Sequence, residues 1–249
     1  VVTYTYNATN QRVSQTEGLT GSCASPVTTA ATRTTSYSYV SPTLDAPTVI
    51  EAPSVQAGSV KRTTLVYGDP RFPTLPTGIT QSGFTPSGTA ISRAVSLAYN
   101  AVGQVTSING PRTDVNDITT LTYYTCTTGG ACGQLASVTN AAGHVTTYDS
   151  YDGAGRLLQL TDANGLRTNY GYNARGRVTS VTQTPPGGTG RSTSYTYNAA
   201  GNVTFTGLPD GRTLSYSYNA AQQLLTVVDN LRNRISYGYD VKGNRTHAY

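Results

Sequence analysis

The side chains that could carry out chemistry are few and scattered in this sequence. Its 249 residues include 2 His, 3 Cys and 12 Asp or Glu. His144 and His247 have no Cys or Ser in a supporting sequence context. The stretch Asp162-Ala-Asn-Gly165 begins like a calcium loop, but it lacks the later acceptors and the final Glu. We therefore expect a turn at residues 162–165, and no catalytic residue, cofactor or metal ion in the chain.

The cysteines allow two interpretations. Cys126 and Cys132 bracket a Gly-rich, turn-forming stretch, where they are either two reduced, half-buried thiols or a disulfide that closes a loop in an oxidising compartment. We expect the disulfide, because the five residues between the two cysteines make a workable ring at a place where a hairpin would turn. A zinc site needs about four ligands, and no Cys or His pair lies nearby. Cys23 has no assigned partner, and its redox state stays open.

The composition favours strands and turns over helices. Charged residues make up 12% and hydrophobic residues 37%, yet 19 residues are Tyr and 26 are Gly. No apolar stretch is long enough to span a membrane as a helix, and no signal peptide is visible. The net charge of +5 comes from scattered Arg residues, so we expect no nucleic-acid partner. Met is absent, which favours a fragment or a processed product of a longer repeat array.

A Tyr-x-Tyr-Asn/Asp motif recurs through the second half of the chain. Its second Tyr, the one before the Asn or Asp, falls at residues 151, 172, 197, 218 and 239, so the intervals are 21, 25, 21 and 21 residues; the copy at Tyr151 has Asp149 in place of the first Tyr. The long interval contains an inserted loop at Pro185–Gly188. A fixed period of this kind indicates a repeat architecture. The residues that define the repeat are Tyr151, Gly155, Arg156, Tyr170, Tyr172, Gly176, Tyr195, Tyr197, Gly201, Tyr216, Tyr218, Tyr237, Tyr239 and Gly243.

Each unit is predicted to be a β-hairpin. Tyr-x-Tyr places two rings on one face of a strand, because strand side chains alternate between faces. Asn or Asp then opens a type I turn, and Gly supplies the positive φ that follows it. A second strand such as 177–182 and a second tight turn complete the unit. The predicted fold class is all-β: hairpins of about 21 residues in one continuous antiparallel sheet, with ladders of Tyr along one face.

The stretch Tyr151-Asp-Gly-Ala-Gly-Arg-Leu157 resembles the YD repeat of the Rhs (rearrangement hot spot) proteins, whose unit is commonly written Y-D-x-x-G-R-L. The units at Tyr172 and Tyr197 match with Asn for Asp, and further copies lie at Tyr99 and Tyr6. The resemblance implies a sheet that spirals into a hollow shell. Such shells enclose a carboxy-terminal toxin in bacterial toxins, and a similar barrel belongs to an adhesion receptor in teneurin-like animal proteins. The family's self-cleaving aspartate protease segment is not visible, so the chain resembles a stretch of shell wall.

Residues 1–249 are predicted to form a single YD-repeat region, irregular in 1–120 and regular in 121–249. Between Leu65 and Ser92, several Pro and Gly residues interrupt the pattern. We expect longer strands with irregular connections there, still within the same sheet. Tyr37-Ser-Tyr39 and Leu97-Ala-Tyr99 are the expected strand anchors on either side.

The expected function is structural and non-enzymatic: a segment of the wall of a shell that encloses a toxin or other cargo, in a secreted or cell-surface bacterial protein. The expected partners are neighbouring repeats, copies of the chain itself and an enclosed toxin domain. One alternative is an adhesive or glycan-binding module, with a polar lumen or carbohydrate-binding face formed by Arg156, Arg177 and Arg212. The simpler interpretation of these arginines is that their stems cover apolar rings. Another alternative is a self-assembling fibre or tube that grows through open sheet edges.

Overall fold

The computed structural model describes residues 1–22, 24–29, 32–126 and 129–249. These residues form 22 β-strands and no helix, and 20 of the strands belong to one antiparallel sheet. The predicted all-β fold of repeated antiparallel hairpins is thus confirmed. The chain divides into two units, Val1–Leu121 with Thr139–Gly143, and Thr122–Val138 with His144–Tyr249.

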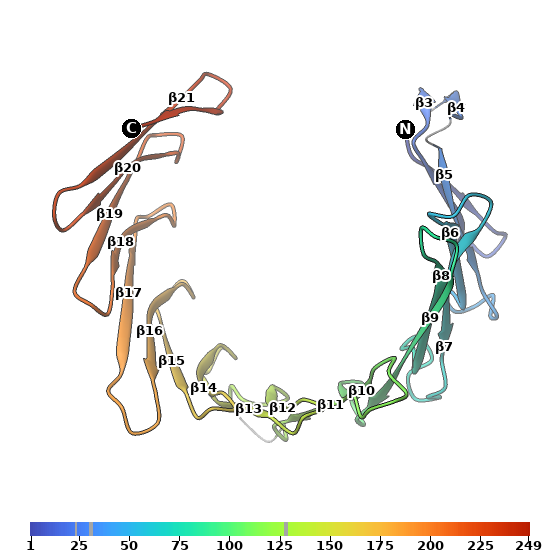
Figure 1. The fold of residues 1–249 in the computed structure, drawn as a ribbon, viewed down its shortest axis with the longest axis horizontal. Helices are drawn as coiled ribbons and strands as arrows, with labels where there is room; N and C mark the ends of the chain where they lie inside the picture. Colours follow the sequence, from blue (N-terminus) through green and yellow to red (C-terminus); the bar gives the residue numbers. More distant parts are fainter. Residues whose placement is uncertain (23, 30–31, 127–128) are drawn as a thin grey trace. The chain divides into compact units, whose positions relative to one another are not determined.

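In the first unit, successive strands pair in chain order, apart from the small separate hairpin β3–β4 (Figure 1). The strands β8 and β9 pair without a bulge from Gly78↔Ser96 to Phe84↔Ala90. The strands are β1 (Thr3–Tyr6), β2 (Arg12–Glu17), β3 (Thr20–Gly21), β4 (Pro26–Val27), β5 (Arg33–Ser38), β6 (Val49–Pro53), β7 (Val60–Val66), β8 (Gly78–Phe84), β9 (Ala90–Tyr99), β10 (Val105–Asn109) and β11 (Ile118–Tyr123), which spans the division.

The second unit repeats one hairpin, and strands β14 to β21 lie side by side in chain order (Figure 1). In each hairpin the register shifts beside the second Tyr, for example between Gly171 and Tyr172, which is the bulge expected after a type I turn with Gly. The strands are β12 (Leu135–Thr139), β13 (Val145–Tyr151), β14 (Leu157–Thr161), β15 (Arg167–Tyr172), β16 (Val178–Thr184), β17 (Arg191–Tyr197), β18 (Val203–Gly207), β19 (Thr213–Tyr218), β20 (Leu224–Asp229), β21 (Arg234–Tyr239) and β22 (Arg245–Ala248).

The two faces of the sheet differ in chemistry. In the first unit the register aligns Tyr37 with Ile50, and Leu65 with Ile79 and Val95, on one face, which we call the tyrosine face. The opposite face carries a polar row across the same strands, formed by Ser36, Glu51, Arg62, Ser82 and Ser92. The alternation of apolar and polar side chains along each strand produces this difference.

The sheet has almost no enclosed core. Among the described residues only the hydrophobic side chains of Leu19 and Ala46 are buried, and no large side chain is fully buried. The described strand contacts join neighbours in the sheet. Each unit is therefore held together by interactions between successive strands, as in a repeat protein, rather than by a central hydrophobic cluster.

Candidate functional site

Each hairpin of the second unit carries the same type of turn, and the turn at Asn173 shows its geometry. The Asn173 N–H donates to the Arg177 carbonyl at 2.9 Å, and the Gly176 N–H donates to the Asn173 carbonyl at 2.9 Å. The Asn173 Oδ1 accepts from the N–H groups of Arg175 and Arg177 at 3.0 and 3.1 Å. Gly176 has a φ of 78°, which glycine adopts without strain. Equivalent turns begin at Asp152, Asn198, Asn219 and Asp240, and the turn predicted at Asp162 is confirmed.

The second Tyr of each motif ties its hairpin to the preceding one through its hydroxyl group. The Tyr172 hydroxyl donates to the Leu157 carbonyl at 2.8 Å, and that of Tyr197 donates to the Val178 carbonyl at 2.6 Å. The same bond recurs for Tyr151 to Leu135 (2.7 Å), Tyr218 to Val203 (2.8 Å) and Tyr239 to Leu224 (2.9 Å). In the first unit, the hydroxyls of Tyr39, Tyr67 and Tyr99 likewise donate to distant carbonyls, those of Arg12, Pro47 and Pro76.

The accepting carbonyls lie just beyond the point where the ladder between two hairpins stops. The β16–β17 ladder ends at Ser180↔Ser194, two residues from Val178. The hydroxyl therefore supplies a donor to a carbonyl that the partner strand does not reach, and a half-buried carbonyl without a donor is costly. Burial raises the pKa of Tyr172 and of Tyr218, so these hydroxyls stay protonated and able to donate at neutral pH.

The first Tyr of the motif differs from the second in that its hydroxyl group, in the part of the chain that the structure describes, does not bond the preceding hairpin. Tyr170, Tyr195 and Tyr216 lie opposite Val181, Thr206 and Val227 in the register. Residues paired in this way have neighbouring side chains on one face of the sheet. Within the described residues these three hydroxyls have no hydrogen bond. The first Tyr thus contributes packing, whereas the second Tyr contributes both packing and a hydrogen bond between hairpins.

The arginine that follows a turn glycine reaches the next turn. The Arg156 Nη1 donates to the Asn173 carbonyl at 3.3 Å, and its guanidinium lies 4.8 Å from the centroid of the Tyr172 ring. Such a position combines a hydrogen bond with a cation–π contact. Arg156 also pairs with Asp152 in its own turn, with 2.6 Å between Nε and Oδ2.

Arg177 repeats this arrangement, and Arg212 does not. The Arg177 Nη1 donates to the Asn198 carbonyl at 3.2 Å, and its guanidinium lies 5.5 Å from the centroid of the Tyr197 ring. Arg212 instead pairs with Asp210 at 2.6 Å and is mostly exposed. The contacts of Arg156 and Arg177 fit the interpretation that their side chains cover rings, while Arg212 lies outside this pattern.

The structure joins Cys126 and Cys132 by a disulfide. Replacing both with Ser is expected to lower the free energy of unfolding by roughly 2 kcal/mol, because the bond closes a short loop in the unfolded chain. Urea denaturation of the oxidised protein and the double variant measures the difference. Adding a reductant should destabilise the wild-type protein and leave the variant unchanged; equal midpoints in all samples would contradict the role. Cys23 lies outside the described residues.

The aspartate turns predict sensitivity to acid. The pKa of Asp152 is lowered by hydrogen bonds from Arg156, first from its N–H, and that of Asp240 by hydrogen bonds from Asn244, first from its side chain. Their ionised forms therefore stabilise the fold above the unfolded pKa of about 3.9, and this stability is lost as the pH falls through the lower folded pKa.

Changing Asp152 and Asp240 to Asn is expected to reduce the loss of stability between pH 5 and 3, since Asn already forms the same turn at Asn173 and Asn198. Urea midpoints measured across this pH range test it. The reverse change, Asn198→Asp, should steepen the acid response. Identical acid responses in all three proteins would show that these carboxylates do not contribute.

The remaining chemistry-bearing residues do not assemble into a site. Within the described part of the chain no group of three or more His, Cys, Asp and Glu could hold a metal ion. His247 stacks on Tyr249, with 5.2 Å between the ring centroids, and His144 directly precedes β13. No helix in the described residues could span a membrane.

Sequence reasoning missed two arrangements. The specific carbonyl partners of the tyrosine hydroxyls depend on the register between hairpins, which a motif does not encode. A hollow on the tyrosine face of the first unit also brings together Lys61 and Arg93, which are far apart in the chain. The one available signal was Gly83, a glycine inside an otherwise regular strand.

The RHS repeat family matches residues 133–166 and 151–189. Among solved structures, TcdB2-TccC3 without its hypervariable carboxy-terminal region is 13% identical, with a TM-score of 0.63 over 99% of this chain and 15% of that chain. A Tc holotoxin pore of Photorhabdus luminescens with a mutated TccC3 is 14% identical, with a TM-score of 0.56 over 99% of this chain and 16% of that chain. This chain thus shares their fold and spans less than a fifth of their length. No curated protein sequence matches it.

Proposed function

We propose that this chain, whose repeats match the RHS repeat family over residues 133–189 and whose fold is that of the Tc toxin structures, forms part of the wall of a hollow, solenoid-like shell that encloses a toxin or other cargo. The main support for the proposal is the set of hydrogen bonds that recurs between successive hairpins. Each second Tyr reaches back to the preceding hairpin, as Tyr197 does to Val178, and Arg177 reaches forward to the next turn. A sheet held in this way extends without a central core, which is what a thin wall requires.

The role of a wall needs no catalytic group, so the proposed function is non-enzymatic. Neighbouring repeats are the partners whose contacts the structure contains. The proposed further partner is an enclosed polypeptide, and its support is that almost the whole chain aligns within much larger Tc toxin components. We also propose that the protein is located outside the cytoplasm. The support is the Cys126–Cys132 disulfide, because disulfides persist in oxidising compartments.

Electron microscopy of the intact protein that carries these residues tests the proposal. The expected result is a hollow particle whose wall contains this sheet, with an interior segment that resists protease until the wall is unfolded. A filament, or a solid particle without an interior segment, would contradict the shell. Cell fractionation tests the compartment separately: the protein is expected outside the cytoplasm, with the disulfide formed.

A further inference from the structure

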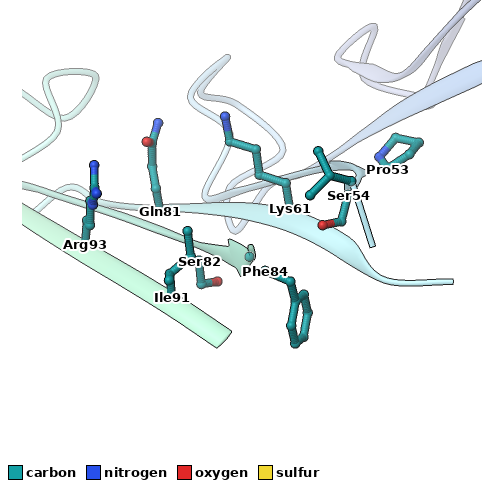
Figure 2. A pocket seen from close by; sticks show the side chains of 10 residues that line it. Pro53, Ser54, Lys61, Gln81, Ser82, Phe84, Ile91 and Arg93 are labelled. Atoms are coloured by element: carbon teal, nitrogen blue, oxygen red, sulfur yellow. The ribbon is translucent and has the colours of Figure 1, made fainter. Parts of the chain in front are cut away.

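A hollow of about 340 Å³ lies on the tyrosine face of the first unit, at the ends of strands β7, β8 and β9. Its lining includes Lys61, Gln81, Gly83, Ile91 and Arg93. Figure 2 shows the side chains of Lys61, Gln81 and Arg93 pointing to one side of the sheet, and that of Phe84 pointing to the other. A volume of this size is in the usual range for small-molecule pockets.

The strand register explains the hollow. Gly83 pairs with Ile91, and a side chain on Gly83 would lie 3.8 Å from the Cα of Lys61. Gly83 thus leaves a gap between Lys61 on one neighbouring strand and Ile91 on the other. On the adjacent rung, Gln81 pairs with Arg93. Two cations and an amide therefore border a gap with an apolar wall.

Neither backbone geometry nor packing requires glycine at position 83. Gly83 is not among the glycines with positive φ, and an added Cβ would make only ordinary van der Waals contacts. Glycine inside a strand weakens it, and one recurring reason for its presence is the close approach of a ligand. The open space above Gly83 fits this reason.

The charges around the hollow are unbalanced. No carboxylate lines it, and among the described residues neither Lys61 nor Arg93 forms an ion pair. By contrast Arg62, next to Lys61 but on the opposite face, pairs with Glu51 at 2.6 Å. The hollow therefore presents positive charge and hydrogen-bond donors beside the apolar side chain of Ile91.

We propose that this hollow binds a small organic anion, whose negative group lies between Lys61, Gln81 and Arg93 and whose apolar body lies over Gly83 against Ile91. The charged side chains supply charge-assisted hydrogen bonds to a carboxylate, sulfonate or phosphate group. The apolar part of the ligand occupies the space that a side chain at position 83 would fill. This site is independent of the proposed wall function.

The test compares two dyes with closely related ring systems. The probe is 8-anilinonaphthalene-1-sulfonate, and N-phenyl-1-naphthylamine is its analogue without the sulfonate. Fluorescence titration of the whole chain is expected to show that the double change Lys61→Gln and Arg93→Gln weakens sulfonate binding by about tenfold or more, since charge-assisted hydrogen bonds are lost. Binding of the neutral analogue should stay unchanged. Lys242→Gln, which removes one positive charge from a turn of the second unit, controls for the loss of charge alone.

A second variant tests the shape of the hollow. Gly83→Val is expected to fill it and to weaken both dyes by about tenfold, while the urea midpoint stays the same or rises, because valine suits a strand. Gly83→Ala, whose Cβ fits without displacement, checks that any loss does not arise from unfolding. Sulfonate affinity that is unchanged in both the charge and Gly83 variants would overturn the proposal.

Discussion

Replacing Tyr172, Tyr197 and Tyr218 together with Phe is expected to lower the free energy of unfolding by about 3 kcal/mol. Each change keeps the ring and removes the hydroxyl that donates to a carbonyl of the preceding hairpin, at 2.6 to 2.8 Å. A hydrogen bond of this kind contributes about 1 kcal/mol, and the three sites are separated by whole hairpins, so their effects add. Urea denaturation followed by circular dichroism measures the sum.

The matched control changes the first tyrosine of the same motifs. Tyr170, Tyr195 and Tyr216 lie on the same strands as the tested residues, but their hydroxyls have no hydrogen bond within the described residues. Changing these three residues to Phe is expected to alter stability by less than about 0.5 kcal/mol each, as for other groups without a lost partner. If the two triple variants were equally stable, the hydroxyl ties would not hold the hairpins together.

The second large effect is expected at Gly201. Its φ is 104°, and an added Cβ would lie 2.8 Å from Nη2 of Arg177. Gly201→Ala should therefore cost about 2 to 3 kcal/mol: about 1 to 2 from backbone strain, and about 1 from displacing the arginine that donates to the Asn198 carbonyl.

Gly211→Ala separates these two causes. Gly211 also has a positive φ, of 84°, but no atom lies within 4 Å of its added Cβ, so only the strain of about 1 to 2 kcal/mol applies. The double variant Arg177→Ala and Gly201→Ala should cost less than the sum of its parts, because the clash is absent once the arginine is truncated. Equal losses for Gly201→Ala and Gly211→Ala would show that the arginine contributes nothing to this turn.

Much of the fold could be predicted from the sequence, because the turn-forming residues and the 21-residue period both indicate the same series of hairpins. Asn173 and Gly176 specify a turn through their own backbone preferences, and the spacing of 21 residues places the next turn at the same edge of the sheet. The partner of the Tyr197 hydroxyl was beyond such reasoning. It depends on where the ladder between two hairpins stops, which is set by the register of both strands together.

The hollow of the first unit could not be predicted from the sequence pattern. Lys61 and Arg93 lie on different strands without a shared motif, and only the pairing of β7, β8 and β9 brings them to one face. The same holds for Tyr67 and Tyr99, whose hydroxyls bond the carbonyls of Pro47 and Pro76 although the repeat pattern is irregular around them. Tertiary register rather than local preference decides such contacts.

The hydrogen bonds between hairpins also affect how the number of repeats in such a chain can change during evolution. Each tie joins a hairpin to the next one and uses the same positions of the motif, as Tyr172, Tyr197 and Tyr218 show. A duplication or deletion of one 21-residue unit by recombination would leave every remaining hairpin with a neighbour of the same kind. Array length can therefore vary in whole-hairpin steps without any compensating substitution elsewhere.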